Sequence, residues 1–403
     1  MTFPYVVRRG DTLSRISARY GTNLASLYGA NPQISEGDTL HPGQVIHIPV
    51  GSANRYTVRA GDTYGSLAER FRLTVPELAA SNPGVDPRRL RIGQPLVIPA
   101  KECVTALRCA EPYGYAEMME DLSLLGQKYP DLSIGSIGRS VSGRDIPWVR
   151  IGQGPSEVLY NASFHANEWI TSLLLMRFLE EYAATVYTGA PSLGGYEVRP
   201  LFEQTTLWLI PMVNPDGVEL VHHGAAPGDP SSGRLLEWNG GSHDFSGWKA
   251  NIRGVDLNDQ FPACWEAERD RRGVPGPGPR DYPGSAPLTE PEAAAMAAFT
   301  RSRPLSMVMA FHTQGREIYW NYRDCEPPEA AELAGRLAWI SGYRAVKLTG
   351  SDAGYKDWFI QEFRRPGFTI EAGFGVNPLP ISQFPRIYDE LLPLMLEGLR
   401  LQV

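Results

Sequence analysis

An internal repeat is the feature of this sequence that most restricts how the chain can fold. The segment Y-V-V-R-R-G-D-T-L that begins at Tyr5 returns as Y-T-V-R-A-G-D-T-Y from Tyr56. The dipeptides N-P, G-Q and I-P then follow both copies in the same order, with one residue lost from the second copy. A repeat whose copies begin 51 residues apart, at Tyr5 and Tyr56, corresponds to one supersecondary unit per copy. We therefore expect two small N-terminal modules, residues 4–50 and 55–100, in place of one domain.

The residues of each unit predict the order strand, helix, helix, strand. In the first unit Tyr5 and Val7 alternate as in a strand, and Gly10 follows at a turn. Asp11 or Thr12 can cap a helix, and the Asn-Pro pair ends a second helix, because the residue before proline disfavours helical backbone. Each unit is thus predicted to be a βααβ module.

These modules resemble LysM repeats through the G-D-T, N-P, G-Q and I-P marks taken together. The resemblance implies binding of N-acetylglucosamine-containing glycans between the G-D-T loop and the loop after the second helix. An alternative is that residues such as Asp11 and Asn31 only cap helices and shape turns. The implied glycan-binding residues are Gly10, Asp11, Thr12, Leu13, Asn31, Pro32, Ile34, Gly61, Asp62, Thr63, Tyr64, Asn82 and Pro83.

A second, larger domain is predicted after a linker at residues 101–110. Within residues 111–403, strand-like apolar runs at 158–164, 205–213, 305–311 and 368–370 alternate with helix-like segments at 169–182 and 288–300. We expect Thr289 to cap the second of these helices. Such alternation favours a mostly parallel sheet covered by helices on both faces. The sequence leaves open whether Cys103 and Cys109, in the linker, form a disulfide.

Polar side chains stand at the ends of these four runs. His165, Asn214, His312 and Glu371 each follow one of them directly. In open α/β sheets, functional groups gather at the carboxyl ends of the strands. We therefore expect these four residues to meet at one edge of the sheet.

His165 and Glu168 stand three residues apart in F-H-A-N-E-W, in a chain with only seven histidines. A catalytic zinc usually takes three His or carboxylate ligands and keeps one position open. Of the remaining histidines, His312 is the one placed at a strand end, so it is the candidate third ligand. The alternative is a chance pair. A serine nucleophile is disfavoured, because G-x-S-x-G does not occur at a strand-to-helix turn.

The domain resembles the zinc carboxypeptidase family over about residues 111–403. The resemblance rests on F-H-A-N-E-W, P-M-V-N-P-D-G, G-V-D-L-N, F-H-T-Q-G and F-T-I-E-A-G, in that order. It implies an α/β/α sandwich with a mixed, mostly parallel sheet, and Zn²⁺ bound by His165, Glu168 and His312. It also implies Glu371 as the general base that activates water and passes its proton to the leaving amine. Arg253 would polarise the scissile carbonyl.

A carboxypeptidase must hold a free C-terminal carboxylate, and at several positions used for this purpose the chain carries a different residue from the family. Asn258 is kept, but Asp259 replaces the arginine of the family's Asn-Arg pair, and a carboxylate there would repel the substrate terminus. Asn167 stands where many members carry another arginine. Thr349 takes the place of the family's phenol, for which Tyr355 is the nearest substitute.

Lys356 matches the family position at the floor of the pocket for the leaving residue. A cation there suits a side chain that ends in a carboxylate, such as that of meso-diaminopimelate. The alternative is that Lys356 points to solvent.

Together these features resemble the γ-D-glutamyl-meso-diaminopimelate endopeptidases, which cut the stem peptides of peptidoglycan and include a type from sporulating bacilli. The resemblance implies a bacterial enzyme of the cell wall or spore that LysM modules hold on its substrate. Two alternatives are a carboxypeptidase that trims stem peptides and a glycan-binding protein whose peptidase domain is inactive.

Composition agrees with this hypothesis. The net charge is −7 and the pI is about 5.6, whereas nucleic-acid binding normally requires a basic surface. The chain contains no apolar run long enough to span a bilayer. Its first residues lack the apolar segment of an ordinary secretory signal, so we expect cytoplasmic or forespore origin, or another export route.

Overall fold

The computed structural model describes most of the large domain and parts of the N-terminal repeats. The described residues are 2–7, 12–13, 27–28, 31, 33–34, 40–41, 44–49, 54–58, 62–70, 75–80, 82, 85–87, 90–91, 93–98, 113–129, 132–225 and 231–401. The chain divides into two compact units, Met1–Ala110 and Glu111–Val403. The predicted linker and the Cys103–Cys109 pair lie outside the described residues.

The second repeat shows the whole predicted module. Its order is β3 (Asn54–Thr57), α3 (Tyr64–Arg70), α4 (Val75–Ala80) and β4 (Pro95–Ile98), with β3 and β4 antiparallel. In the first repeat β1 (Thr2–Val6) pairs antiparallel with β2 (Val45–Pro49), and most of the segment between them lies outside the described residues. Each repeat has its own small core, around Leu27 and Ile46 in the first and Leu67 and Leu78 in the second.

The large domain is built on an eight-stranded sheet in the order β13-β12-β14-β11-β7-β10-β6-β5. Its strands are β5 (Ser133–Arg139), β6 (Asp145–Ile151), β7 (Ser156–Ala162), β10 (Thr205–Ile210), β11 (Leu305–His312), β12 (Glu317–Tyr319), β13 (Arg344–Val346) and β14 (Gly367–Glu371). The central strands β10, β7, β11 and β14 are mutually parallel, whereas β5, β6 and β12 add antiparallel pairings. The predicted mixed, mostly parallel sheet is therefore confirmed.

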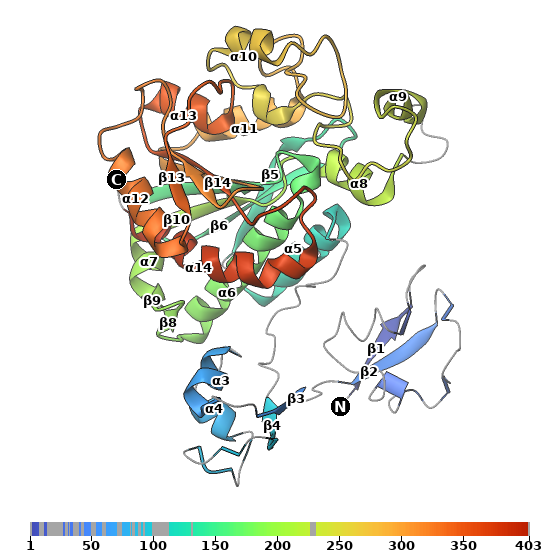
Figure 1. Cartoon of the computed structure of the whole chain (residues 1–403), viewed down its shortest axis with the longest axis vertical. Coiled ribbons are helices and arrows are strands. Elements are labelled where there is room, and N and C mark those ends of the chain that lie inside the picture. The colour runs from blue at the N-terminus through green and yellow to red at the C-terminus, as the bar shows by residue number, and fades with distance from the viewer. Residues whose placement is uncertain are drawn as a thin grey trace. The chain divides into compact units, whose positions relative to one another are not determined.

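Helices cover both faces of this sheet (Figure 1), as expected for an α/β/α sandwich. Helices α11 and α13 pack on one face, and α6 and α14 lie on the other. The helices of the domain are α5 (Tyr115–Lys128), α6 (Ile170–Thr188), α7 (Val198–Gln204), α8 (Pro215–His223), α9 (Ser232–Trp238), α10 (Trp265–Arg272), α11 (Pro291–Arg301), α12 (Ala330–Ser341), α13 (Tyr355–Phe363) and α14 (Phe384–Arg400).

The start of α11 corrects one prediction. Glu290, not Thr289, occupies the N-cap position, and a proline opens the helix. The Thr289 hydroxyl and backbone amide instead contact the side-chain oxygen of Gln260. Thr289 therefore anchors the loop before the helix.

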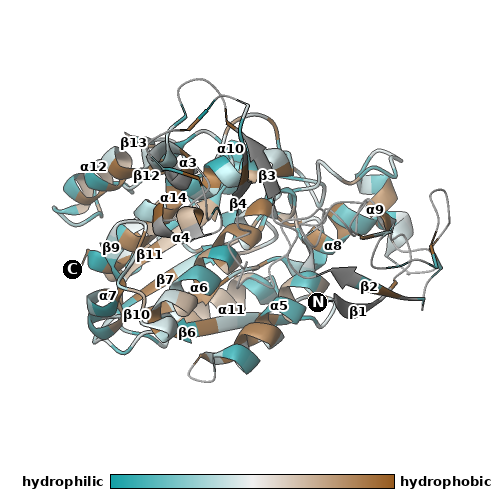
Figure 2. Cartoon of the chain, turned by 90° about the horizontal axis from the view of Figure 1, so that it is seen from below, coloured by the Kyte–Doolittle hydropathy of each residue, from teal (hydrophilic) through white to brown (hydrophobic). Residues whose placement is uncertain are grey.

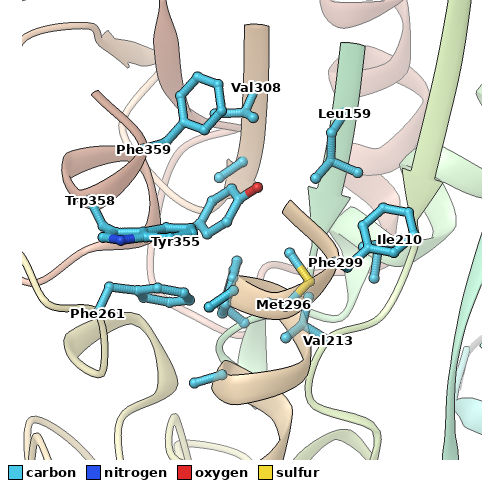
Figure 3. Close-up of a cluster of buried hydrophobic side chains, with 14 of the residues drawn as sticks. Leu159, Ile210, Val213, Phe261, Met296, Phe299, Val308, Tyr355, Trp358 and Phe359 are labelled. Atoms are coloured by element: carbon cyan, nitrogen blue, oxygen red, sulfur yellow. The ribbon is translucent and has the colours of Figure 1, made fainter. Parts of the chain in front are cut away.

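The hydrophobic core on the side of the sheet that α11 and α13 cover is rich in aromatic side chains. Phe261 stacks on Trp358 with ring centroids 5.5 Å apart, and both pack beside the fully buried Tyr355 (Figure 3). Leu159 and Val308, from neighbouring central strands, complete this cluster. Burying aromatic side chains of this size is strongly stabilising, so α13 is held firmly against the sheet.

Hydropathy colouring shows hydrophobic residues on the inner sides of α14 and on the strands, with hydrophilic residues on outer turns such as those of α7 and α12 (Figure 2). Helix α14 follows this pattern, since Leu391, Leu394 and Met395 are fully buried. Among the helices described, none is both long and apolar enough to cross a membrane.

Candidate active site

Three buried ligand groups converge at the carboxyl ends of β7 and β11. The Nδ1 atom of His165 lies 2.9 Å from Glu168 Oε1, and that of His312 lies 2.9 Å from Glu168 Oε2. The two Nδ1 atoms are 3.1 Å apart. All three residues are at most 6% exposed. Two imidazole nitrogens and a carboxylate that face one point form the donor set expected of a zinc site.

The fold explains why these residues meet. His165 follows β7 and caps a short 3-10 helix (Ala166–Glu168), so a single turn presents both His165 and Glu168. Strand β11 lies parallel to β7 and ends at His312. The ring of Phe164 stacks on His312 at 6.1 Å between centroids and fixes its plane from the core side.

Electrostatics within the cluster support an ionised carboxylate. Burial would raise the pKa of Glu168, but the two neighbouring histidines hold that pKa well below its ordinary value. Burial would lower the pKa of His165, yet Glu168 and Asp256 together raise it to about 9. Burial lowers the pKa of His312. A metal cation at this point would bind the deprotonated forms of the histidines and the carboxylate.

Behind the ligands lie two residues that the sequence did not single out for this role. Asp256 Oδ1 is 3.2 Å from His165 Nε2, the ring nitrogen that faces away from the cluster. Lys249 Nζ is 2.7 Å from Asp256 Oδ2. Carboxylates in this outer position fix the tautomer and orientation of a metal-binding histidine. The G-V-D-L-N motif contains Asp256 and could have indicated it; nothing in the sequence marks Lys249.

Asn377 is another residue that the sequence analysis missed. Its side-chain amide lies 3.3 Å from Glu168 Oε1 and also donates to the Thr313 carbonyl oxygen at 2.9 Å. The backbone amide of Thr313 donates to Glu168 Oε2 at 3.2 Å. These contacts hold the Glu168 carboxylate in place from the side of the β14 loop.

Glu371 ends β14 directly beside His312, its register partner on β11. Burial and the neighbouring charge of Glu168 raise the pKa of Glu371 to about 8. A bound divalent cation would act in the opposite direction and favour the carboxylate. We call His165, Glu168, Asp256, His312 and Glu371 the metal edge.

The region of Asn258 and Asp259 is occupied by internal contacts. Asn258 accepts a hydrogen bond from the Tyr355 amide at 3.1 Å. Asp259 is 3% exposed and lies 2.8 Å from Arg272, which also contacts Glu268 and Asp281. Burial and the charge of Asp256 raise the pKa of Asp259 to about 7. Asp259 is therefore a paired group, not the bare carboxylate that the sequence suggested.

The two cations of this region differ in burial. The Arg253 side chain is 53% exposed and lies 3.6 Å from Glu290, whereas the Lys249 side chain is 15% exposed beside Asp256. The charge of Lys249 also acts on the pKa values of His165, His312 and Glu371, in addition to the larger effects of burial. Lys249 is thus the cation that the described structure brings to the metal edge.

Asn167 and Tyr355, two further predicted site residues, lie in different surroundings. Asn167 is buried within the turn between the ligands, and its amide nitrogen is 3.4 Å from the Gly247 carbonyl oxygen. Its side-chain oxygen is buried without a hydrogen-bond partner among the described residues. Tyr355 is fully buried, and its hydroxyl bonds to Thr300 at 2.9 Å. As a substitute for the family's phenol, Tyr355 is therefore a poor candidate, because its hydroxyl points into the core.

Lys356 does not point to solvent. It is 4% exposed, donates to the Asn321 carbonyl oxygen at 2.7 Å and forms an ion pair with Asp357. It lines a pocket of about 340 Å³ together with Thr349.

Within the repeats, the described glycan-binding candidates fall into two groups. Thr12 and Thr63 are exposed and Asp62 is half-buried, whereas Leu13, Asn31, Ile34, Tyr64 and Asn82 are buried. The Asn31 amide donates to the carbonyl oxygens of Leu27 and His47, and Asn82 donates to that of Leu78. These two asparagines therefore shape the module, as the alternative interpretation held. Gly10, Asp11, Pro32, Gly61 and Pro83 lie outside the described residues.

The sequence of this chain is similar to that of a known protein family. A family model described as zinc carboxypeptidase matches residues 118–392, more than half of the chain. The chain belongs to the zinc carboxypeptidase family. The LysM domain model matches residues 5–49 and 56–99 of this family member, so two LysM domains precede the carboxypeptidase-family domain.

Individual relatives agree with this assignment. The chain is 53% identical over 289 residues to γ-D-glutamyl-L-diamino acid endopeptidase 1 of Lysinibacillus sphaericus, covering 72% of each chain. It is 41% identical over 281 residues to the uncharacterised protein YqgT of Bacillus subtilis, covering 69% of this chain and 74% of that one. Bovine thrombin-activatable fibrinolysis inhibitor shares the fold, with a TM-score of 0.56 and 18% identity over 72% of this chain and 96% of that one.

Proposed function

We propose that this protein is a zinc-dependent endopeptidase that cleaves the γ-D-glutamyl–meso-diaminopimelate bond of peptidoglycan stem peptides. The observation that carries the proposal is the pairing of a carboxypeptidase-family metal edge with a changed substrate region. Where a carboxypeptidase needs a free cation for the chain end, Asp259 and Arg272 neutralise one another. The 53% identity to an L. sphaericus enzyme named for the same type of bond supports this choice.

His165, Glu168 and His312 would hold the zinc ion. When bound, zinc supplies Lewis acidity, which lowers the pKa of water and polarises a carbonyl group. Glu371, half-buried beside the cluster, takes the proton from the attacking water and delivers it to the amine of the leaving diamino acid. Its position directly beside His312 at the end of β14 suits a group that must both accept and return a proton.

The scissile carbonyl also needs a fixed cation as negative charge develops on its oxygen. We assign this role to Lys249, because its ammonium group lies beside Asp256 and its charge reaches the metal edge. The resemblance to the family had favoured Arg253. Its half-exposed side chain lies 3.6 Å from Glu290.

The leaving diamino acid would enter the pocket beside Lys356. A buried ammonium group there would meet a carboxylate at the end of the substrate side chain. Asn167 would contribute its unpaired buried oxygen as an acceptor for a substrate N–H, and Asn258 would keep the start of α13 in register with the site.

The LysM domains would bind the glycan strands to which the stem peptides are attached. Binding of both parts of one substrate raises the local concentration of stem peptide at the active site. Thr12, Asp62 and Thr63 are the described candidates that remain accessible. This arrangement would hold the enzyme at the bacterial cell wall, and a role in sporulation is the more specific form of the proposal.

The products of muropeptide digestion test the proposed bond. The zinc-loaded enzyme should release a fragment that begins with diaminopimelate and leave D-glutamate at the new chain end, both identified by mass spectrometry. Release of single terminal amino acids alone would instead establish a carboxypeptidase that trims stem peptides.

A truncated chain tests the role of the LysM domains. Residues 111–403 form a compact unit with its own core. We expect them to cleave a soluble stem peptide like the full chain, but to digest intact sacculi at least about tenfold more slowly because the tether is lost. Equal rates on sacculi would remove the LysM domains from substrate capture.

A further inference from the structure

A loop follows Glu371 and runs beside the metal edge. Residues 372–380 join the end of β14 to the 3-10 helix Ile381–Gln383, and we call them the β14 loop. At the tip of this loop, Phe374 and Val376 are 71% and 83% exposed. Hydrophobic burial therefore does not hold the tip in place, and its position must come from polar contacts.

Two glutamines hold the tip from its outer side. The Phe374 amide donates to Gln383 Oε1 at 3.3 Å, and Gln383 Nε2 donates to the Phe374 carbonyl oxygen at 2.8 Å. The Gly375 amide donates to Gln314 Oε1 at 3.3 Å. These hydrogen bonds are exposed, and water competes for the same donors and acceptors. We therefore expect a less exposed contact to determine how firmly the loop is held.

Asn377 supplies this contact on the inner side. The Thr313 hydroxyl donates to Asn377 Oδ1 at 2.8 Å, and Asn377 Nδ2 donates to the Thr313 carbonyl oxygen at 2.9 Å. The same nitrogen lies 3.3 Å from Glu168 Oε1. A side-chain amide nitrogen carries two N–H donors, so both donors of Asn377 face an acceptor. These two acceptors also decide which end of the amide faces Glu168.

Thr313 completes the support of the same carboxylate. Its backbone amide donates to Glu168 Oε2 at 3.2 Å, and it directly follows His312 in the chain. Each oxygen of Glu168 therefore faces a donor from one member of the Asn377–Thr313 pair. We call these two residues the carboxylate clamp. The clamp connects the turn after β7, the end of β11 and the β14 loop.

The carboxylate clamp differs from the support of His165. Asp256 contacts His165 from a loop outside β14, whereas Asn377 belongs to the loop that continues from Glu371. A cation at the metal edge would fix the carboxylate of Glu168, and with it the anchor of Asn377. Coupling between two binding events is reciprocal. A loop that bound metal helps to order must therefore help, by the same factor, to bind the metal.

We propose that the carboxylate clamp couples zinc binding to the order of the β14 loop, with Asn377 as the positioning residue that transmits the effect. The proposal rests on the zinc site of the proposed function. It goes beyond that function, because the loop would be held firmly only in the metal-loaded protein. The metal edge and the segment that follows Glu371 would thus be assembled together.

The zinc affinity of the full-length protein provides the first test. Asn377→Ala removes the donor to Glu168 Oε1, so we expect the zinc dissociation constant, measured by competition with a chromogenic chelator, to rise by about 10–100-fold. Thr313→Val keeps the shape of the side chain and the backbone amide but loses the bond to Asn377, and should cause a smaller rise. Asn239→Ala, which removes a side chain that bonds within its own turn, is the matched control. Wild-type affinity in Asn377→Ala would overturn the proposal.

Hydrogen exchange measures the order of the loop directly. In the wild type, zinc should slow the exchange of the backbone amides of residues 372–377 by at least about tenfold relative to the metal-free protein. Asn377→Ala should lose most of this protection, even at zinc concentrations that fill the site. Equal exchange with and without zinc in the wild type would show that the loop and the metal site are independent.

Gln383→Ala separates coupling from a local contact. Gln383 holds the backbone of Phe374 and lies outside the carboxylate clamp, so its loss should speed exchange in the β14 loop. Because coupling is reciprocal, the zinc dissociation constant should also rise, by about fivefold, which is the lower end of typical coupling factors. Faster exchange with an unchanged dissociation constant would mean that Asn377 supports Glu168 only locally, and the coupling would be wrong.

Thermal unfolding of the metal-free proteins distinguishes the support of zinc from general damage to the fold. We expect metal-free Asn377→Ala and Thr313→Val to unfold near the wild-type temperature, with the difference appearing when zinc is added. If metal-free Asn377→Ala is strongly destabilised, Thr313→Val and Gln383→Ala decide the question, because both keep the side chain of Asn377.

The measurements of zinc affinity and hydrogen exchange do not depend on which peptide bond is cut, so this inference and the proposed function can fail separately. If the variants behave as expected but the wild type releases only terminal amino acids, the endopeptidase assignment is wrong and the coupling stands. If the variants bind zinc and exchange like the wild type while the γ-D-glutamyl bond is cleaved, the coupling is wrong and the proposed function stands.

Discussion

Buried carboxylates occur in two regions of this domain and behave in opposite ways. At the metal edge, Glu168 and Asp256 each contact a histidine, and the pKa of each lies well below its ordinary value. Between α5 and α6, Glu180 is fully buried, and both of its oxygens lack a hydrogen-bond partner among the described residues. Burial raises its pKa to about 8.

The difference shows that burial alone does not create a reactive site. A carboxylate that is buried with partners stays ionised and can hold a cation, whereas one buried without partners takes up a proton. Glu168 and Asp256 are therefore kept ionised by their partners, whereas Glu180 is not. Four substitutions test this contrast, from chemistry at the metal edge to stability between the helices.

Glu371→Gln should produce the largest effect. The amide has the same shape but cannot accept the proton of water, so kcat should fall by about 10²–10⁴-fold. Zinc content, measured by atomic emission, should stay at the wild-type level, because Glu371 is not one of the three proposed ligands. Glu317→Gln is the matched control, since Glu317 pairs with Glu371 across β12 and β14. Unchanged turnover in Glu371→Gln would remove this residue from the mechanism.

Removing Lys249 compares the two candidate cations. Lys249→Met should lower kcat by about 10²–10³-fold, the cost of losing one fixed charge at the developing oxyanion. Arg253→Met should change kcat by no more than about threefold, because surface charges contribute little. Steady-state kinetics on one soluble stem peptide measures both variants. The reverse order would return the polarising role to Arg253, as the family resemblance implied.

Asp256→Asn probes the support of the ligands. Asp256 contacts the outer nitrogen of His165, and such partners are worth about 10–100-fold in metal affinity. We expect zinc dissociation constants, measured by competition with a chromogenic chelator, to rise by that factor. Near-normal turnover in saturating zinc would separate this effect from a direct role in catalysis. A dissociation constant equal to that of the wild type would show that His165 needs no such support.

The sequence allowed most of the metal edge to be predicted, because the ends of parallel strands meet and His165, His312 and Glu371 follow such strands. Asp256, the remaining carboxylate of the metal edge, was missed. The two N-terminal modules could be predicted equally well, since each module is short and its turn residues recur in both copies. The other residues of the site could not be predicted, because their positions depend on contacts between loops that are distant in the sequence. Arg272 reaches back to Asp259 from the end of α10, and Lys249 meets Asp256 in a loop without regular periodicity. Tyr355 failed as a substitute phenol because helix α13 turns it into the core.

The pocket beside Lys356 shows the same limit of prediction from sequence. Lys356 could be placed in a pocket by its family position. Its neighbours Asn321 and Asp352 lie on separate segments, and no local pattern brings them together. Side chains at the ends of strands inherit their positions from the sheet, whereas side chains on loops acquire theirs only in the folded domain.

Glu180→Gln tests the other half of the contrast through stability. Burial gives the carboxyl group of Glu180 a pKa of about 8 in the folded protein, against an ordinary value of 4.5. Between these values the unfolded state binds fewer protons, so the free energy of unfolding should fall as the pH rises from about 4.5 to 8. The neutral amide does not titrate, and Glu180→Gln should remove this part of the decline, a gain of roughly 2–4 kcal/mol at pH 8 relative to pH 4.5.

Urea unfolding of the wild type and the variant at several pH values from 4.5 to 8 measures the difference. Glu332→Gln, on the exposed side of α12, controls for the loss of one negative charge. Parallel pH profiles for wild type and Glu180→Gln would mean that Glu180 is ionised in the folded protein. It would then have to share the charge of Lys128 or Arg177, which lower its pKa, and the contrast with the metal edge would disappear.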